Sequence, residues 1–132
     1  MNPNYSRTIT LYNRIRAKDS AGKADDWHRT VLRGCSWSYD QDKGRYTVRI
    51  PEAYPGNRPY AAYRRWKDNP GSAFTLSESD LIVLGECSEM VTGRSPDTAA
   101  EILIRNKPDA FLIKSFADNT SHPAGKHYKV GG

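Results

Sequence analysis

Histidines are the first residues to consider as general bases or metal ligands. His28, His122 and His127 form no HxH or HExxH pattern and belong to no Cys/His cluster. A metal site near the C-terminus would need His122 and His127 together with a third ligand such as Asp118, and the spacing gives no support for one. His28 alternates with Trp27 on a predicted strand, so we expect it to be a surface or rim residue.

The two cysteines offer no more chemistry than the histidines. Cys35 and Cys87 are far apart in the sequence and match no metal-binding spacing. Neither has the positive surroundings that activate a thiol, so we expect both to be free thiols that pack in the core. No glycine-rich phosphate loop follows a strand and opens a helix. We therefore expect no enzyme, no metal and no cofactor.

A more informative stretch is YPGNRPYAAYRRWK, residues 54–67, which interleaves aromatic rings with basic groups. Such a surface can bind single-stranded nucleic acid, with rings stacking on bases and cations pairing with phosphates. We favour the alternative of an ordered loop whose rings pack on its own core or on a neighbouring subunit, because its prolines favour one rigid shape. The candidate residues for a subunit interface or a DNA-facing loop are Arg58, Tyr60, Tyr63, Arg64, Arg65, Trp66 and Lys67.

The composition predicts one domain with a modest core and a polar surface. The chain has 132 residues, 37% of them hydrophobic, and a mean hydropathy of −0.77, which fits a single domain over residues 1–132. It has no apolar run of about 18 residues, so we expect no membrane span, and we expect no signal peptide. A net charge of +5 with a pI of about 9.3 is compatible with a nucleic-acid partner without requiring one.

Residues 74–91, FTLSESDLIVLGECSEMV, are predicted to form the centre of the fold. We expect a strand at 74–76, a polar turn at 77–80 and a second strand that begins with Leu81–Leu84. This is the one run of four large aliphatic residues in the chain. A strand without a polar face is typical of burial on both sides. The other segments are therefore expected to cover it.

Alternating apolar and polar residues predict further strands in the rest of the chain. These strands are expected at residues 7–15, 27–32, 35–39, 45–50, 110–116 and 127–130. A hairpin turn is expected at residues 40–44. Residues 51–73 carry several prolines and are predicted to form a long loop with one helical turn at 61–66. Loops of this length are usually functional or mobile.

One convincing helix is predicted, at about residues 96–106. Ser95 is the expected N-cap and Pro96 the first helical residue, and Ala99, Ile102 and Leu103 form an apolar stripe. The fold is therefore predicted to be mainly β: a small β-barrel or sandwich with one α-helix at about 96–106 and a long loop at 51–73.

Several of these segments together resemble a known group of proteins. The segments are TITLYNR (8–14), WHRTVLRGCSW (27–37), DLIVLGEC (80–87) and SFADNTSHPAGKHYKVGG (115–132). They look like short phage and prophage proteins of Gram-positive hosts that are encoded in the morphogenesis module. The chain is similar in this way to head-closure (stopper) and head–tail connector proteins. Residues 51–73 and the helix match that group only in kind.

The resemblance implies a structural protein of the virion, made in the host cytoplasm and assembled as a ring in the phage neck. Its expected partners are copies of itself, portal or adaptor proteins, tail proteins and, without sequence specificity, packaged DNA. Head-to-tail contacts would close such a ring. Two alternatives remain open: a tail-completion (terminator) protein, and an OB-like module that binds single-stranded nucleic acid.

Overall fold

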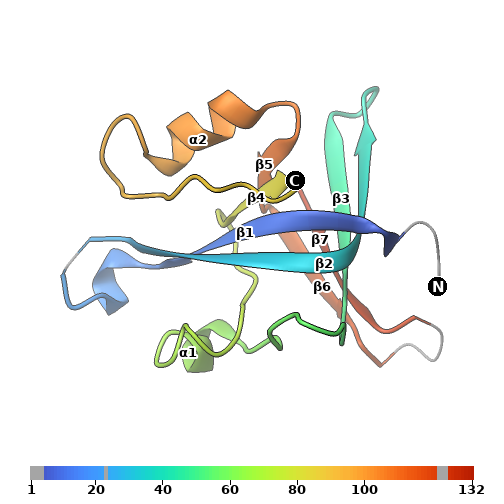
Figure 1. Cartoon of the computed structure of the whole chain (residues 1–132), viewed down its shortest axis with the longest axis horizontal. Helices are drawn as coiled ribbons and strands as arrows, with labels where there is room; N and C mark the ends of the chain where they lie inside the picture. Colours follow the sequence, from blue (N-terminus) through green and yellow to red (C-terminus); the bar gives the residue numbers. More distant parts are fainter. Residues whose placement is uncertain (1–4, 23, 122–124) are drawn as a thin grey trace.

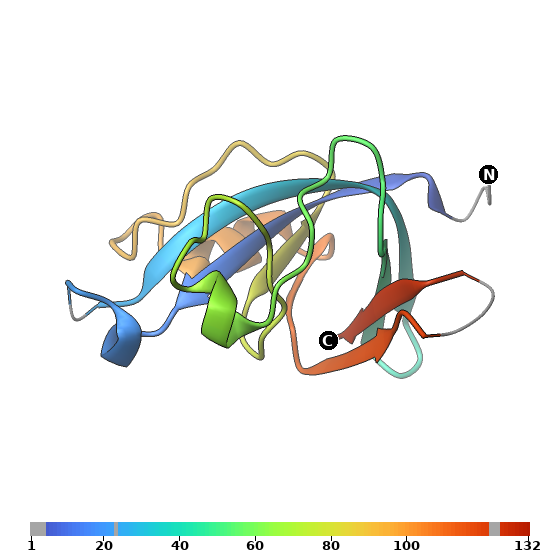
Figure 2. The ribbon, with the colours of Figure 1, turned by 90° about the horizontal axis from the view of Figure 1, so that it is seen from below.

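The structure is a computed structural model that describes residues 5–22, 24–121 and 125–132. Its strands are β1 (Arg7–Ile15), β2 (Asp26–Asp40), β3 (Arg45–Pro51), β4 (Leu81–Leu84), β5 (Ala110–Leu112), β6 (Ser115–Asn119) and β7 (His127–Gly131). These seven strands form one antiparallel sheet in the order β5-β4-β1-β2-β3-β7-β6. The sheet curls into half a barrel (Figures 1 and 2). The prediction of a mainly β fold is confirmed.

The long strand β2 belongs to both halves of this sheet. Its first part pairs with β1 and its second part pairs with β3, and the register with β1 shifts at a bulge between the two parts. Gly34 lies in the bulge with a φ of 72°, and a Cβ there would come within 2.4 Å of the Tyr54 ring. Only glycine fits this position. The two strands predicted at 27–32 and 35–39 are therefore one bent strand.

We call β5, β4, β1 and the first part of β2 the covered half of the sheet. The second part of β2, with β3, β7 and β6, is the open half. The concave side of both halves holds the main hydrophobic core. Ile9 and Leu11 of β1, Ile82 of β4, and Val48 and Ile50 of β3 all point into it and are fully buried. Because side chains alternate along a strand, the residues between them face the convex side.

On the convex side, the covered half packs against helix α2 (Ala99–Asn106) (Figure 1). Tyr12 of β1 and Leu81 and Val83 of β4 form a second buried cluster with Ile102 of α2. Strand β4 is thus buried on both faces, as its run of aliphatic residues predicts. The open half has no helix of the described chain on its convex side.

Helix α2 begins later than the sequence prediction of 96–106. Its N-cap is Thr98, whose hydroxyl accepts from the Glu101 amide (3.2 Å), while the Glu101 carboxylate accepts from the Thr98 amide (3.4 Å). This capping box satisfies two amides at the helix start. The prediction of Ser95 as the N-cap and Pro96 as the first helical residue is wrong. The Ser95 hydroxyl instead donates to the Glu101 carboxylate at 2.9 Å.

The hairpin predicted within residues 74–91 is also wrong. Strand β4 pairs with β1 and β5, and residues 74–76 belong to no ladder. These residues lie beside β1, where hydrogen bonds of the Asn13 side chain to the Thr75 backbone replace a strand pairing. Its Nδ2 donates to the Thr75 carbonyl (2.6 Å) and its Oδ1 accepts from the Thr75 amide (3.2 Å). Residues 86–91 likewise form no strand.

The strand predicted at 110–116 is divided into β5 and β6. Ile113 and Lys114 lie between them, where the chain passes from one edge of the sheet to the other. The Ile113 amide donates to the Asp80 carbonyl and the Lys114 amide to the Gly131 carbonyl, both at 2.8 Å. These bonds connect the two halves of the curl. The strands predicted at 7–15, 45–50 and 127–130 are present as β1, β3 and β7.

Candidate interaction surfaces

The segment of residues 51–73 packs onto the main core. The centroid of the Tyr60 ring lies 4.6 Å from that of Tyr128 and 5.8 Å from that of Phe116. The backbone of Tyr60 forms a parallel bridge with Phe74. Burial raises the pKa of the Tyr60 hydroxyl. This ring therefore extends the chain's own core, and the long loop covers part of the concave side.

The single helical turn expected in this segment is present as α1 (Tyr63–Trp66). Trp66 is only 1% exposed, its Nε1 donates to the Ala73 carbonyl (3.1 Å), and it packs in a third cluster with Ile15 at the end of β1. His28 meets the Trp66 ring edge-on, with centroids 5.6 Å apart. His28 is half-buried, as expected of a rim residue.

Tyr63 fastens α1 to the loop after β1. Its hydroxyl accepts from the Arg16 amide (3.0 Å) and donates to the Asp19 carboxylate (2.8 Å), and the Arg16 guanidinium lies 4.8 Å from its ring centroid. The hydrogen bond from Tyr63 lowers the pKa of Asp19. Of the two interpretations of the 54–67 stretch, the structure thus favours rings packed within the chain. They form no free platform on which bases could stack.

The basic residues of this stretch differ from one another in their surroundings. Arg58 donates to the Thr30 hydroxyl at 3.3 Å, and Lys67 lies 3.9 Å from an Asp19 oxygen. Arg64 and Arg65 are exposed, and neither side chain makes a hydrogen bond or ion pair with another described residue. The seven predicted contact residues therefore separate into three buried or half-buried rings, two cations with partners inside the chain (Arg58 and Lys67) and two free arginines on α1.

Strand β6 is a second exposed feature, and no sequence motif indicated it as a contact surface. It is the last strand of the sheet, and β7 is its one partner strand among the described residues. Its residues are exposed from Ser115 to Asp118, and the Phe116 side chain remains 39% exposed although it touches Tyr60. The outer edge of β6 therefore presents backbone groups that another strand could pair with.

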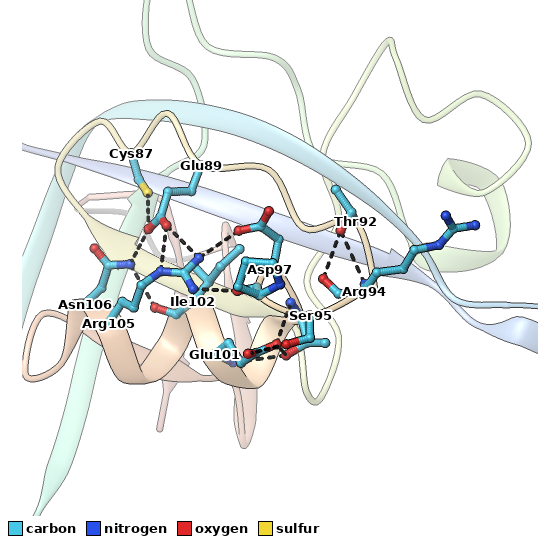
Figure 3. Close-up of polar contacts among 12 residues, drawn as sticks. Cys87, Glu89, Thr92, Arg94, Ser95, Asp97, Glu101, Ile102, Arg105 and Asn106 are labelled. Carbon is cyan, nitrogen blue, oxygen red and sulfur yellow. Dashed lines mark hydrogen bonds and ion pairs between the residues drawn. The ribbon is translucent and has the colours of Figure 1, made fainter.

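The irregular segment that precedes α2 is fastened to the helix by polar contacts (Figure 3). The Arg105 guanidinium pairs with Glu89 (2.7 Å) and Asp97 (3.0 Å), and the Asn106 amide donates to Glu89 at 2.9 Å. The hydrogen bond from Asn106, followed by that from Arg105, lowers the pKa of Glu89. All three charged side chains are partly exposed, so solvent screens these ion pairs. We interpret this network as structural.

His127 and the two cysteines have surroundings that suit structural roles. His122 lies outside the described residues. His127 donates from Nδ1 to the Gly125 carbonyl (2.6 Å) and accepts at Nε2 from Asn119 (3.2 Å). Cys35 and Cys87 are free thiols, as predicted, and burial raises the pKa of Cys35 to about 12. Such a thiol stays protonated and inert.

The residues that the structure describes contain neither a metal-binding group nor a helix that could span a membrane. No group of three or more His, Cys, Asp or Glu side chains there could hold a metal ion. No helix there has the length and apolar character needed to cross a membrane.

The structure brings together one set of residues that the sequence did not single out. A groove of about 450 Å³ lies on the open half, and Lys43, Arg45, Lys114 and Lys129 line it. These residues come from the β2–β3 turn, from strands β3 and β7, and from the connection between β5 and β6. The alternation in RYTVRI placed Arg45 on a polar face, but only the pairing of β3 with β7 brings it near Lys129.

Comparison with known proteins gives a family and no function. No curated protein and no solved structure matches the chain. The model of one family, described as a family of unknown function (DUF6751), matches residues 4–132. The match covers nearly the whole chain, strands and connecting segments alike, so the chain belongs to this family of unknown function.

Proposed function

We propose that this chain is a structural subunit of a phage neck, part of a head–tail connector or head-closure ring. The resemblance of its strand motifs to phage morphogenesis proteins suggests the role. The observation that carries the proposal is strand β6, an edge strand with an unpaired outer side and a partly exposed Phe116. Exposed edges are normally protected by charge, proline or cover. Asp118 is the one charged residue within β6, and the outer backbone groups of this strand can pair with another chain.

A closed ring needs two different surfaces on each subunit, because its contacts are head-to-tail. Strand β6 supplies one of them. Helix α1, with Arg64 and Arg65 free on its surface, is a second and chemically different patch. The acidic Asp118 is exposed on β6, so the two patches are complementary in charge. In this proposal the partners are copies of the chain and the neighbouring portal, adaptor and tail proteins, and the chain resides in the virion.

The test is a pair of matched variants. Phe116→Glu places a charge at the β6 edge, and Ile104→Glu makes the same change on α2, where Ile104 is 69% exposed. We expect electron micrographs and mass photometry of the purified chain to show rings for the unmodified chain and for Ile104→Glu, but monomers for Phe116→Glu. Urea unfolding would check that both variants are folded.

Deletion of the gene from the prophage that encodes it tests the position of the ring. We expect DNA-filled heads and complete but unjoined tails. Tails of abnormal length would instead assign the chain to tail completion. A chain that stays monomeric at every concentration, and whose deletion leaves normal particles, would contradict the neck proposal.

A further inference from the structure

Several basic side chains lie together on the convex face of the open half. Val48 and Ile50 of β3 and Val130 of β7 point into the core, so Arg49 and Lys129 project from the opposite face. These two residues are direct partners in the β3–β7 register. Paired residues of antiparallel strands have Cα atoms about 5 Å apart. Two like charges directly opposite each other destabilise a sheet, so the free chain gains nothing from this pair.

The cations of this face have no carboxylate partners within the described chain. Lys43, Arg45, Arg49, Lys114 and Lys129 make no ion pair and no side-chain hydrogen bond with a described residue. Several cations elsewhere are paired, for example Arg33 with Glu86 at 2.8 Å and Arg105 with Glu89, although Arg64 and Arg65 of α1 are not paired with any described residue. The open half thus gathers on one face five cations that have no carboxylate partner among the described residues.

Two carboxylates lie near this face, at the tip of the β2–β3 hairpin. Asp40 is the register partner of Arg45. Its Oδ1 accepts from the amides of Asp42 (3.0 Å) and Lys43 (3.3 Å), which directs it into the turn. Asp42 is the second carboxylate and is exposed. Five cations against two carboxylates leave the face strongly positive.

Between the cations the floor of the groove is flat and polar. Thr47, Gly131 and Ser115 are partners across β3, β7 and β6. A Cβ at Gly131 would lie 2.7 Å from the Ser115 hydroxyl, so glycine keeps the floor open. The hydroxyls of Thr47 and Ser115 donate to no other described residue. Free hydroxyls and cations around a flat floor are typical donors to phosphate oxygens.

The groove offers no free aromatic ring. Tyr46 is the one ring that lines it among the described residues. That ring is stacked with Tyr39 (4.3 Å between centroids) and with Phe111 (4.8 Å), and its hydroxyl donates to the Pro108 carbonyl at 2.8 Å. Base stacking, which single-strand binders use, is therefore not available here. We therefore expect the ligand to be the phosphate backbone of a nucleic acid whose bases remain paired.

We propose that the convex face of the open half binds the phosphate backbone of double-stranded DNA without regard to sequence. Lys43, Arg45, Arg49, Lys114 and Lys129 pair with phosphates, and the Thr47 and Ser115 hydroxyls donate to phosphate oxygens. This binding is a property of the single chain and does not require the ring. If each of the five cations contacts one phosphate, log K falls with log salt concentration with a slope of about −4.5.

The experiment measures fluorescence anisotropy of a labelled duplex of about 20 base pairs across salt concentrations of about 50 to 200 mM. Arg45→Gln/Lys129→Gln removes two cations from the face. The control Lys18→Gln/Arg94→Gln removes two exposed cations that belong to neither proposed contact surface, so both variants have the same net charge. We expect the first variant to reduce the slope by about two and the control to leave it nearly unchanged.

Several outcomes would overturn the proposal. Equal effects of the two variants would mean that net charge alone attracts the duplex. No binding by the unmodified chain at the lowest salt concentration would also reject it, as would a strong preference for one duplex sequence or for a single strand of the same length. Urea unfolding of both variants excludes misfolding as the cause. Mass photometry on the same samples reports ring formation separately, so failure of the neck proposal is distinguishable from failure of this one.

Discussion

The two halves of the sheet share one core but present opposite kinds of convex face. In the covered half, Tyr12, Leu81 and Val83 point outward and are buried under α2 by contact with Ile102. In the open half, the same outward positions hold cations, hydroxyls and glycine, and no described helix lies over them. Alternating strands therefore form an apolar convex face where a helix covers them and a polar convex face where no described helix does.

Strand β2 shows where this change occurs. Its bulge at Gly34 turns the strand from the covered half into the open half. A bend of this kind lets a short chain build a concave core without a second sheet. The covered half is therefore expected to supply the stability, and the open half the contact surface. This division of roles predicts that substitutions in the two halves differ in their effect on stability.

Trp66→Ala should have the largest effect, because the indole fills the third cluster beside the end of β1. We expect a loss of about 4 kcal/mol in the free energy of unfolding, as for other buried aromatic residues. The measurement is the urea midpoint. Arg65→Ala, one residue away and exposed, should change stability by less than about 0.5 kcal/mol. A small loss of stability for Trp66→Ala would mean that the indole is not part of the core and that residues 54–67 form a free surface.

Ile102→Ala compares the two convex faces directly. Ile102 is fully buried between α2 and β4, so we expect a loss of about 3 kcal/mol. Lys129→Ala on the open half should be neutral or slightly stabilising, because it relieves repulsion from Arg49. If Lys129→Ala destabilised the chain as much as Ile102→Ala, the convex face of the open half would contribute to stability, and the proposed division of roles between the two halves would be wrong.

Asp80 should give a smaller effect that depends on pH. It is buried at the start of β4, where burial raises its pKa to about 7. Hydrogen bonds from Asn13, Arg14 and Ser77 act in the opposite direction. Because the folded state binds the proton more tightly than the unfolded state, the stability due to Asp80 is full below about pH 4 and falls as pH rises toward 7.

Asp80→Asn removes this titration. The new amide NH2 group faces the N–H groups that now donate to the carboxylate, so we expect the free energy of unfolding to fall by about 2 kcal/mol at low pH. We expect the stability difference between the unmodified chain and Asp80→Asn to shrink from pH 4.5 to pH 7.5 in urea unfolding, at most by about 1.4 kcal/mol per pH unit. The exposed carboxylate variant Asp68→Asn is the control. A difference that grows with pH would mean that the three hydrogen bonds keep the carboxylate ionised.

Local patterns in the sequence determined much of the secondary structure. The alternation of residues 7–15 and 45–50 correctly indicated β1 and β3, although β1 is buried on both faces from Ile9 to Asn13. The aliphatic run of β4 correctly indicated burial on both sides. The apolar stripe with Ile102 indicated α2, although Thr98 rather than Ser95 begins it. These features depend on neighbours within a few residues, which the sequence displays directly.

The strand pairings and the surfaces depend on contacts between distant segments. Asn13 binds the Thr75 backbone across 62 positions, and residues 74–76 form no hairpin with β4. Trp66 packs against Ile15, which is distant in the sequence, and this contact favours the predicted ordered loop over a free surface for nucleic acid. Arg45, Lys114 and Lys129 form one groove because β3, β7 and β6 lie side by side. Such contacts depend on the free energy of the whole packed chain, and a local sequence pattern carries no record of which distant segments meet.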